Sequence, residues 1–443
     1  VISRTSLEVV FELVNENNHI YAHRLIGDSL YLIGNHYVHA DMDEYRPKMI
    51  INGTETKFID YSNIHYFDDT DIGGMTKIIG VKLHADPTQI SVSGEAYLGA
   101  GYSYKQIYMT ATDLYISDSN FYIDEKAFYQ TMTISQHKLL LDKAGSEFVA
   151  AGTVEGGMLN QFSMDEYNGY LRVATGNVVG KATEERFSFT TEIINSLYIL
   201  RVNSAHAGFN VISHISEGIG KPNERIMSVR FNGDKAFIVT FLRTDPLYVI
   251  DLSDPENPVI TDAIELPGYD TYQHAWGENY LMGLGYDAND NGVITGTKLT
   301  AYKVTSGEAS ELQTFVVSLG EEGDEKTWRW SDSEGNRNHK AIFVSVKDNL
   351  FGFPYTEWTY NDPQDGEYGV TKHQSVYYMF KIDMSSETPI AILIEETHSL
   401  LNEHQVAVRR AIKINNHLYF FSDTHVSVYN TLTNELAAPI EVS

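Results

Sequence analysis

The chain has 443 residues, of which 60 are acidic and 32 are basic, and its formal net charge is −28. This charge argues against nucleic acid and against simple docking on anionic lipid, because both partners need a basic surface. Zero cysteines exclude disulfides, thiolate zinc sites and cysteine nucleophiles, and no apolar stretch approaches the ~18 residues of a transmembrane segment, so we expect none in this chain.

The first predicted element is a strand in "SLEVVFELV", from Ser6 to Val14. It precedes the first hairpin and is typical of the outer strand of a four-stranded sheet whose inner strands are absent. The chain also begins at Val1 rather than at methionine. Either the fold closes by an unusual exchange of strands, or an N-terminal part of the natural protein precedes Val1.

Seven hairpins of one type follow along the chain. Each has a β-rich run, a tight polar turn and a second β-rich run, as in "YAHRLIGDSLYLIGN" from Tyr21 to Asn35. Asparagine, aspartate and glycine occupy the turns because they tolerate the positive φ of tight hairpins. The predicted turns lie at residues 27–28, 112–113, 168–169, 232–234, 277–278, 347–349 and 415–416.

Two further strands follow most of these hairpins. The clearest case is "PLYVIDLSDPENPVITDAIELPG", Pro246 to Gly268, in which a turn with two prolines separates a third strand from a fourth. Four-stranded antiparallel units that recur along a chain are typical of an all-β propeller, in which each unit is one blade. We therefore predict a single β-propeller domain over 1–443 with seven recognisable blades, either a whole ring or part of an eight-bladed one.

Three polar insertions interrupt the repeat, near residues 36–75, 320–338 and 357–373. Long loops on a rigid scaffold often carry binding function. The second and third insertions contain four aromatic residues that could stack on a sugar or a peptide: Trp328, Trp330, Trp358 and Tyr360. The alternative is that these side chains pin the loops to the blade beneath them.

A candidate calcium loop lies in "DANDNG". Asp287, Asn289 and Asn291 supply oxygen ligands at alternate positions, and Gly292 follows for a sharp turn. Thr295 could complete the site, whereas the position of the usual glutamate is a lysine, which excludes an EF-hand. The alternative is a polar turn between strands. A weaker acidic candidate is "DDTDIGG", residues 68–74.

Catalytic signatures are missing from the sequence. Asp165 and Glu166 are neighbours in "SMDEYNG", where strand alternation directs them to opposite faces, so they cannot form a glycosidase pair on their own. Ser163 has no G-x-S-x-G setting, and no such motif occurs elsewhere. These residues are better explained as part of a hairpin.

Four ordered motifs resemble the prokaryotic secreted β-propeller family that is distantly related to WD repeats. They are "LNQFSMDEYNGYLRVAT", "ERIMSVRFNGDKAFIVTF", "DPLYVIDLSDPENP" and "HKAIFVSVKDNLFGFP". The similarity extends from about Ala22 to the C-terminus and is densest between Leu159 and Gly296. It implies export and a propeller fold, and it supplies no catalytic residues.

Two functions remain open. The leading hypothesis is an exported, non-catalytic binding or surface-assembly module that contacts a protein or glycan at the cell exterior, or a second copy of itself, through the inserted loops. The alternative is a secreted enzyme that acts on polysaccharide or peptide with acids gathered at the axis of the propeller. In either case we expect a secreted or cell-surface location, with calcium as the candidate cofactor.

Overall fold

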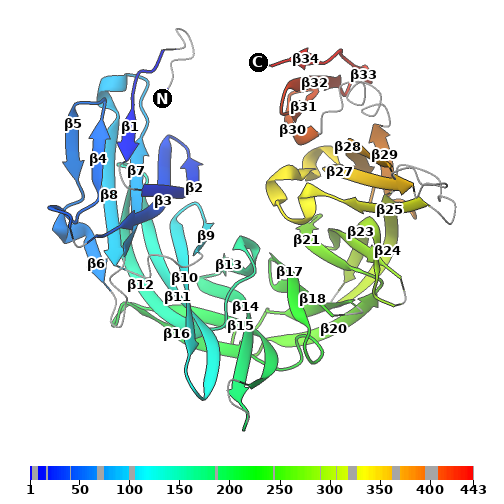
Figure 1. The fold of residues 1–443 in the computed structure, drawn as a ribbon, viewed down its shortest axis with the longest axis horizontal. Helices are drawn as coiled ribbons and strands as arrows, with labels where there is room; N and C mark the ends of the chain where they lie inside the picture. Colours follow the sequence, from blue (N-terminus) through cyan, green and yellow to red (C-terminus); the bar gives the residue numbers. More distant parts are fainter. Residues whose placement is uncertain are drawn as a thin grey trace. The chain divides into compact units, whose positions relative to one another are not determined.

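The computed structural model of the protein describes residues 1, 8–15, 18–39, 41–66, 74–98, 105–184, 188–242, 245–289, 291–305, 307–317, 327–361, 370–394 and 408–442. They fold into two compact units, Val1–Glu217 and Gly218–Ser443. The elements of both units are β-strands and short 3-10 helices (Figure 1). No helix among these residues is long and apolar enough to cross a membrane.

The first unit contains three four-stranded blades. The strands of the first blade, in sheet order, are β2 (Asn18–Ile26), β3 (Ser29–Tyr37), β7 (Gly74–Lys82) and β8 (Ser91–Leu98). The second blade consists of β9 (Lys105–Met109), β10 (Asp113–Ile123), β11 (Ala127–Leu140) and β12 (Gly145–Glu155). The third consists of β13 (Met164–Tyr167), β14 (Tyr170–Ala182), β15 (Phe189–Asn203) and β16 (Gly208–Ile215).

The second and third blades share one eight-stranded sheet. Long hairpins extend both blades, and at their ends β11 pairs with β14 through Ala127–Lys181 and Phe128–Gly180. Phe128 also meets Phe189 edge to face, with ring centroids 5.4 Å apart. This pairing joins residues far apart in the chain, and the sequence patterns did not predict it.

The second unit contains four blades. The fourth blade of the chain consists of β17 (Arg225–Asn232), β18 (Lys235–Phe241), β19 (Asp245–Asp251) and β20 (Val259–Leu266), and the fifth of β21 (Tyr269–Ala275), β22 (Tyr280–Ala288), β23 (Ile294–Thr305) and β24 (Glu308–Val317). The sixth consists of β26 (Phe343–Ser345), β27 (Leu350–Asn361), β28 (Val370–Ile382) and β29 (Ile390–Ile394). The seventh consists of β30 (Val408–Ile414), β31 (His417–Ser422), β32 (His425–Asn430) and an outer strand that is split into β33 (Glu435–Leu436) and β34 (Ile440–Glu441). Together the two units confirm the seven predicted blades. One ring of all seven stays a prediction.

Each of the seven predicted turns separates a pair of antiparallel strands. Asn168 and Gly169 have φ of 52° and 78°, the left-handed conformation that a two-residue hairpin turn requires. At the fourth hairpin, Asn232 is still the last residue of β17 and pairs with Lys235, so the turn itself is Gly233–Asp234. Local turn chemistry therefore predicts these hairpins almost to the residue.

The described part of the insertion over 36–75 contains regular strands, which corrects the expectation of a long loop. It forms β4 (Lys48–Ile51), β5 (Glu55–Phe58), the 3-10 helix η1 (Tyr61–Asn63) and β6 (Ile64–Tyr66). The N-terminal strand β1 (Leu13–Asn15) pairs with β4, so it belongs to this added sheet rather than to the outside of a blade. Phe11, Met49 and Ile59 are buried in one apolar cluster with residues of β7 and β8, such as Ile79 and Ala96, so the added sheet packs on the first blade. The acidic stretch at 68–71 lies outside the described residues.

Apolar layers between neighbouring blades form the core of each unit. In the first unit, Tyr31 and Ile78 of the first blade pack with Leu114 and Ile116 of the second. In the second unit, the corresponding layer between the last two blades includes Tyr377 and Phe420, whose ring centroids lie 5.5 Å apart. Neighbouring blades within a unit therefore bury their facing surfaces by stacking on one another, which is the reason for the repeat.

A turn of the second blade also docks on the first blade through backbone oxygens. Ser93 donates a hydrogen bond from its Oγ to the Ala144 carbonyl at 2.8 Å, and Ser29 donates to the Leu141 carbonyl at 2.9 Å. Gly80 of β7 leaves room for the Ala144 carbonyl, because a Cβ at that position would stand 1.4 Å from its oxygen. The close approach of these blades depends on that glycine.

Candidate functional site

The second and third insertions meet as paired strands in the second unit. The strand β25 (Thr327–Asp332) pairs antiparallel with the distal half of β27, and the register places Trp330 opposite Trp358 and Trp328 opposite Tyr360. The four aromatic residues predicted from the sequence therefore form two cross-strand pairs. Directly opposed residues of antiparallel strands lie on the same face of the sheet. The side chain of Trp328 lies outside the described residues.

Trp330 and Trp358 stack on one another. Their ring centroids are 5.9 Å apart and their planes differ by 5°. Trp330 is 47% exposed and Trp358 is half-buried. Trp330 is therefore not buried against a blade, whereas Trp358 is partly covered.

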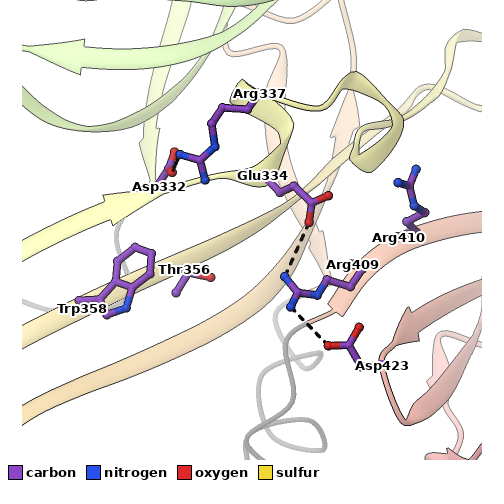
Figure 2. Close-up of a pocket in the computed structure, with 8 residues that line it drawn as sticks. All are labelled: Asp332, Glu334, Arg337, Thr356, Trp358, Arg409, Arg410 and Asp423. Carbon is purple, nitrogen blue, oxygen red and sulfur yellow. Dashed lines mark hydrogen bonds and ion pairs between the residues drawn. The ribbon is translucent and has the colours of Figure 1, made fainter. Parts of the chain in front are cut away.

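A cavity of about 750 Å³ lies next to this pair, in the same unit (Figure 2). Its lining comes from β25, the 3-10 helix η4 (Glu334–Asn336), β27, β30 and the turn between β31 and β32. The lining residues are Asp332, Glu334, Arg337, Thr356, Trp358, Arg409, Arg410 and Asp423. Trp330, Trp358, Arg337, Arg409 and Arg410 together are called the tryptophan–arginine face below.

A β-bulge in β30 explains how two consecutive arginines reach one cavity. Neighbouring residues of a regular strand point to opposite faces. In β30, however, Val408 pairs with Ser422 and Arg410 with Phe421, so Arg409 is an extra residue without a partner position on β31. A bulge of this kind redirects side chains. Arg409 and Arg410 can therefore both line the cavity.

Two of the three arginines are held by carboxylates of the cavity wall. Arg337 forms an ion pair with Asp332, which also accepts hydrogen bonds from the Tyr286 hydroxyl at 2.9 Å and the Ser333 amide at 2.8 Å. Arg409 lies between Glu334 at 3.8 Å and Asp423 at 3.3 Å, as Figure 2 shows. These contacts fix the wall more than they add stability, since the arginine side chains are largely exposed.

Arg410 differs from the other two. Its Nη1 donates a hydrogen bond to the Lys340 carbonyl at 2.6 Å, and no described carboxylate forms an ion pair with it. A guanidinium group has five N–H donors in a planar fork, so a single carbonyl leaves most of them available. Arg410 can therefore donate two parallel hydrogen bonds to an anionic ligand in the cavity.

The candidate calcium loop is the hairpin turn between β22 and β23. Asp287 Oδ2 accepts a hydrogen bond from the Thr295 hydroxyl at 2.6 Å. Asn289 Oδ1 accepts two more, from the amides of Asn291 at 3.0 Å and Val293 at 3.1 Å. The loop thus closes on its own hydrogen bonds, and Asn289 would have to release these amides to bind an ion. Among the described residues, no cluster of three histidine, aspartate or glutamate side chains is placed to hold a metal.

Calcium binding by this loop stays a prediction. A ligand that binds only the folded state stabilises it by mass action, so a chelator is expected to lower the melting temperature of a calcium-bound protein. Asp287→Ala should abolish the difference between the melting curves with and without chelator. If the curves coincide in the original protein and the variant is also neutral, the segment is a hairpin turn without an ion.

The acid pair of the third blade behaves as strand alternation predicts. Asp165 forms an ion pair with Arg172 across the β13–β14 hairpin. Glu166 lies on the other face, where burial and the nearby Asp113 carboxylate raise its pKa, although a hydrogen bond with Tyr115 opposes the shift. The charge of Asp165 also helps to raise the pKa of Glu166, but the two side chains lie on opposite faces of β13 and so do not form a glycosidase pair.

A hydrogen-bonded chain in the first unit has the connectivity of a nucleophile, a base and an acid. His137 Nε2 lies 3.1 Å from the Ser135 hydroxyl, and His137 Nδ1 lies 3.2 Å from Glu95 Oε2. Ser135 is only 2% exposed and His137 is fully buried. A substrate carbonyl must reach the serine oxygen for acyl transfer. Since burial prevents that approach, these residues join β8 of the first blade to β11 of the second.

Sequence reasoning found the aromatic half of the tryptophan–arginine face and missed its charged half. Arg337 lies at the end of a predicted insertion, whereas Arg409 and Arg410 lie in a strand of the last blade. One signal was available. Arg409–Arg410 is the one adjacent arginine pair in a chain of net charge −28.

Comparison with known proteins places the chain in a family. A family model described as a beta propeller domain matches residues 2–434. The uncharacterized protein MJ1554 of Methanocaldococcus jannaschii is 33% identical over 294 residues, which is 66% of this chain and 38% of that protein. An uncharacterized protein of Archaeoglobus fulgidus is 34% identical over 203 residues, 46% of this chain and 27% of that protein. The chain spans well under half the length of these relatives.

Two solved structures are similar at low sequence identity. The periplasmic gluconolactonase of Pseudomonas aeruginosa is 11% identical, with a TM-score of 0.42 over 85% of this chain and 93% of that chain. The propeller domain of the trilobed protease from Pyrococcus furiosus is 12% identical, with a TM-score of 0.31 over 78% and 85%. The family match covers nearly the whole chain and agrees with the blades described above. The chain therefore belongs to the β-propeller domain family.

Proposed function

We propose that the protein is an exported, non-catalytic binding module that contacts a ligand at the cell exterior through its tryptophan–arginine face. The observation that carries this proposal is the stacked Trp330–Trp358 pair at the edge of a 750 Å³ cavity. Small-molecule sites commonly have volumes of ~300–1,000 Å³, with aromatic lining and a few polar groups that fix orientation. Export rests on the resemblance to a secreted family.

The position of the face within the fold supports the same proposal. Most blade side chains are committed to packing between blades, whereas β25 and the distal half of β27 come from insertions in the repeat. An exposed tryptophan supplies a large contact area at a low cost in side-chain entropy. A stacked pair of tryptophans with one member 47% exposed is therefore suited to binding rather than to holding a blade together.

Substitution of Trp330 tests the proposal. Trp330→Ala is expected to weaken ligand binding at least tenfold, because aromatic anchors often contribute ~2 kcal/mol or more to an interface. The same change should lower the free energy of unfolding by only ~1 kcal/mol, the value of an exposed stacking contact. Binding would be measured on a glycan array and by pull-down from the native cell surface, and stability by thermal melting.

Val346→Ala is a matched control, since Val346 is an exposed apolar residue of the same unit outside the cavity lining. It should change neither binding nor stability. If Trp330→Ala and Trp358→Ala both leave binding intact, the ligand contacts another surface and the proposal is wrong. A glycan ligand would be detected on the array, and a protein partner would be detected in the pull-down. Binding to a second copy of the chain would appear in sedimentation as a mass that rises with protein concentration.

A further inference from the structure

The cavity is much less acidic than the chain as a whole, because its lining balances three carboxylates with three arginines. The protein has a formal net charge of −28 and only 32 basic residues, yet three guanidinium groups line this one cavity. A strongly acidic surface repels anions at long range. An arginine cluster on such a surface has a function only at short range, where its hydrogen bonds outweigh the repulsion.

Only one of the three guanidinium groups is without a described carboxylate partner. Arg337 is paired with Asp332, and Arg409 lies between two acids. Arg410 instead donates to a single backbone carbonyl at 2.6 Å. The cavity thus offers one available fork of N–H donors, which matches one carboxylate in a bidentate arrangement.

The remaining lining suits a sugar ring. Trp358 lies at the cavity wall, parallel to the exposed Trp330. The C–H groups on one face of a pyranose ring can stack on such an aromatic surface, whereas its hydroxyl groups point to the ring edge. Glu334 and Asp423 flank Arg409 in the cavity lining (Figure 2), and their remaining oxygen lone pairs can accept hydrogen bonds from those hydroxyls.

The same two carboxylates select against densely charged ligands. A phosphate monoester carries nearly two negative charges near neutral pH, so Glu334 and Asp423 repel it more strongly than they repel a single carboxylate. A ligand with one carboxylate per ring meets the available arginine and keeps its hydroxyls for the acids. Resting on the binding role proposed above, we infer that the tryptophan–arginine face binds a segment of an acidic polysaccharide, with the carboxylate of one hexuronate residue on Arg410 and the ring of another sugar residue on Trp358.

Titration calorimetry with oligouronates tests this inference on the full chain. The probes are tetramers of galacturonate, glucuronate and mannuronate, each compared with its methyl ester, which keeps the shape but removes the charge. At least one free acid should bind at least tenfold more tightly than its ester. A tenfold difference in affinity corresponds to the lower end of the range for a hydrogen bond to a charged group. Arg410→Gln should remove this preference, Arg410→Lys should keep part of it, and Trp358→Ala should weaken acid and ester alike.

Arg225→Gln is the matched control, because Arg225 is exposed on β17 of the same unit and does not line the cavity. It should leave both affinities unchanged. Three outcomes overturn the hexuronate assignment: no binding of any uronate, equal binding of acid and ester, or a preference that Arg410→Gln retains. Binding of neutral sugars or acidic peptides that still depends on Trp358 would overturn the assignment and leave the proposed function intact. Binding that no substitution in the cavity affects would reject both.

Discussion

Replacement of Glu95 by alanine is expected to lower the free energy of unfolding by about 3–5 kcal/mol, because it leaves buried partners without their carboxylate. Glu95 is 4% exposed. It accepts hydrogen bonds from the Ser146 hydroxyl at 2.5 Å and lies 3.1 Å from His65 Nε2 and 3.2 Å from His137 Nδ1. These contacts join the first blade to the second, so their loss should destabilise the first unit. Urea unfolding would be followed by circular dichroism, since all four tryptophans of the chain lie in the second unit.

The stability that Glu95 supplies should also depend on pH. Burial alone would raise its pKa, but hydrogen bonds from His137, His65 and Ser146 together lower it below the ordinary value of 4.5. A carboxylate with a lowered pKa in the folded state stabilises the protein above pH 4.5, and this contribution is lost as the pH falls further. Glu95→Gln should reduce the loss of stability on acidification. Glu192→Ala, an exposed change on β15, should alter neither quantity, and equal effects of the two alanine variants would contradict the prediction.

Replacement of Gly80 by alanine should be similarly damaging, by about 3 kcal/mol, the upper part of the range for overpacking. The added methyl group would stand 1.4 Å from the Ala144 carbonyl oxygen, so one blade must move away from the other. That movement would also break the hydrogen bond from the Ser93 hydroxyl to the same oxygen. Thermal melting and urea unfolding measure the loss directly.

Gly176→Ala is the matched control for this change. Gly176 is in the interior of β14, and an added Cβ there has only the Asn195 Oδ1 within 4 Å, at 3.5 Å. The substitution should leave stability nearly unchanged, because a glycine in a strand interior contributes no packing. Equal losses from both variants would mean that the cost comes from the change of residue type rather than from contact between blades.

Hairpins of this fold could be predicted because their determinants are local. The turn at Asn168–Gly169 needs two adjacent residues that accept positive φ, and both are visible in the sequence. The pairing of β1 with β4 was not predictable in the same way, because it depends on which strand edge is available after the first blade has formed. Alternation and turn residues specify a strand but not its distant partner.

The residues of the candidate site also differ in whether a local sequence signal identifies them. Trp330 and Trp358 stand out because exposed-type aromatics in polar insertions are unusual, and the register then places them opposite one another. Arg410 does not stand out, because it lies in an ordinary strand of another blade. Its position at the cavity depends on the bulge at Arg409. A bulge can be recognised only when both paired strands and their register are known.

The joining of β11 to β14 changes how the second and third blades should open. In a repeat fold whose blades only stack, each sheet can lose its hydrogen bonds separately from the next. Here the ends of the two long hairpins share ladder positions at Ala127–Lys181 and Phe128–Gly180. Amide protons along both hairpins should therefore exchange with solvent deuterium in a single concerted opening, as one cooperative element of the first unit rather than two.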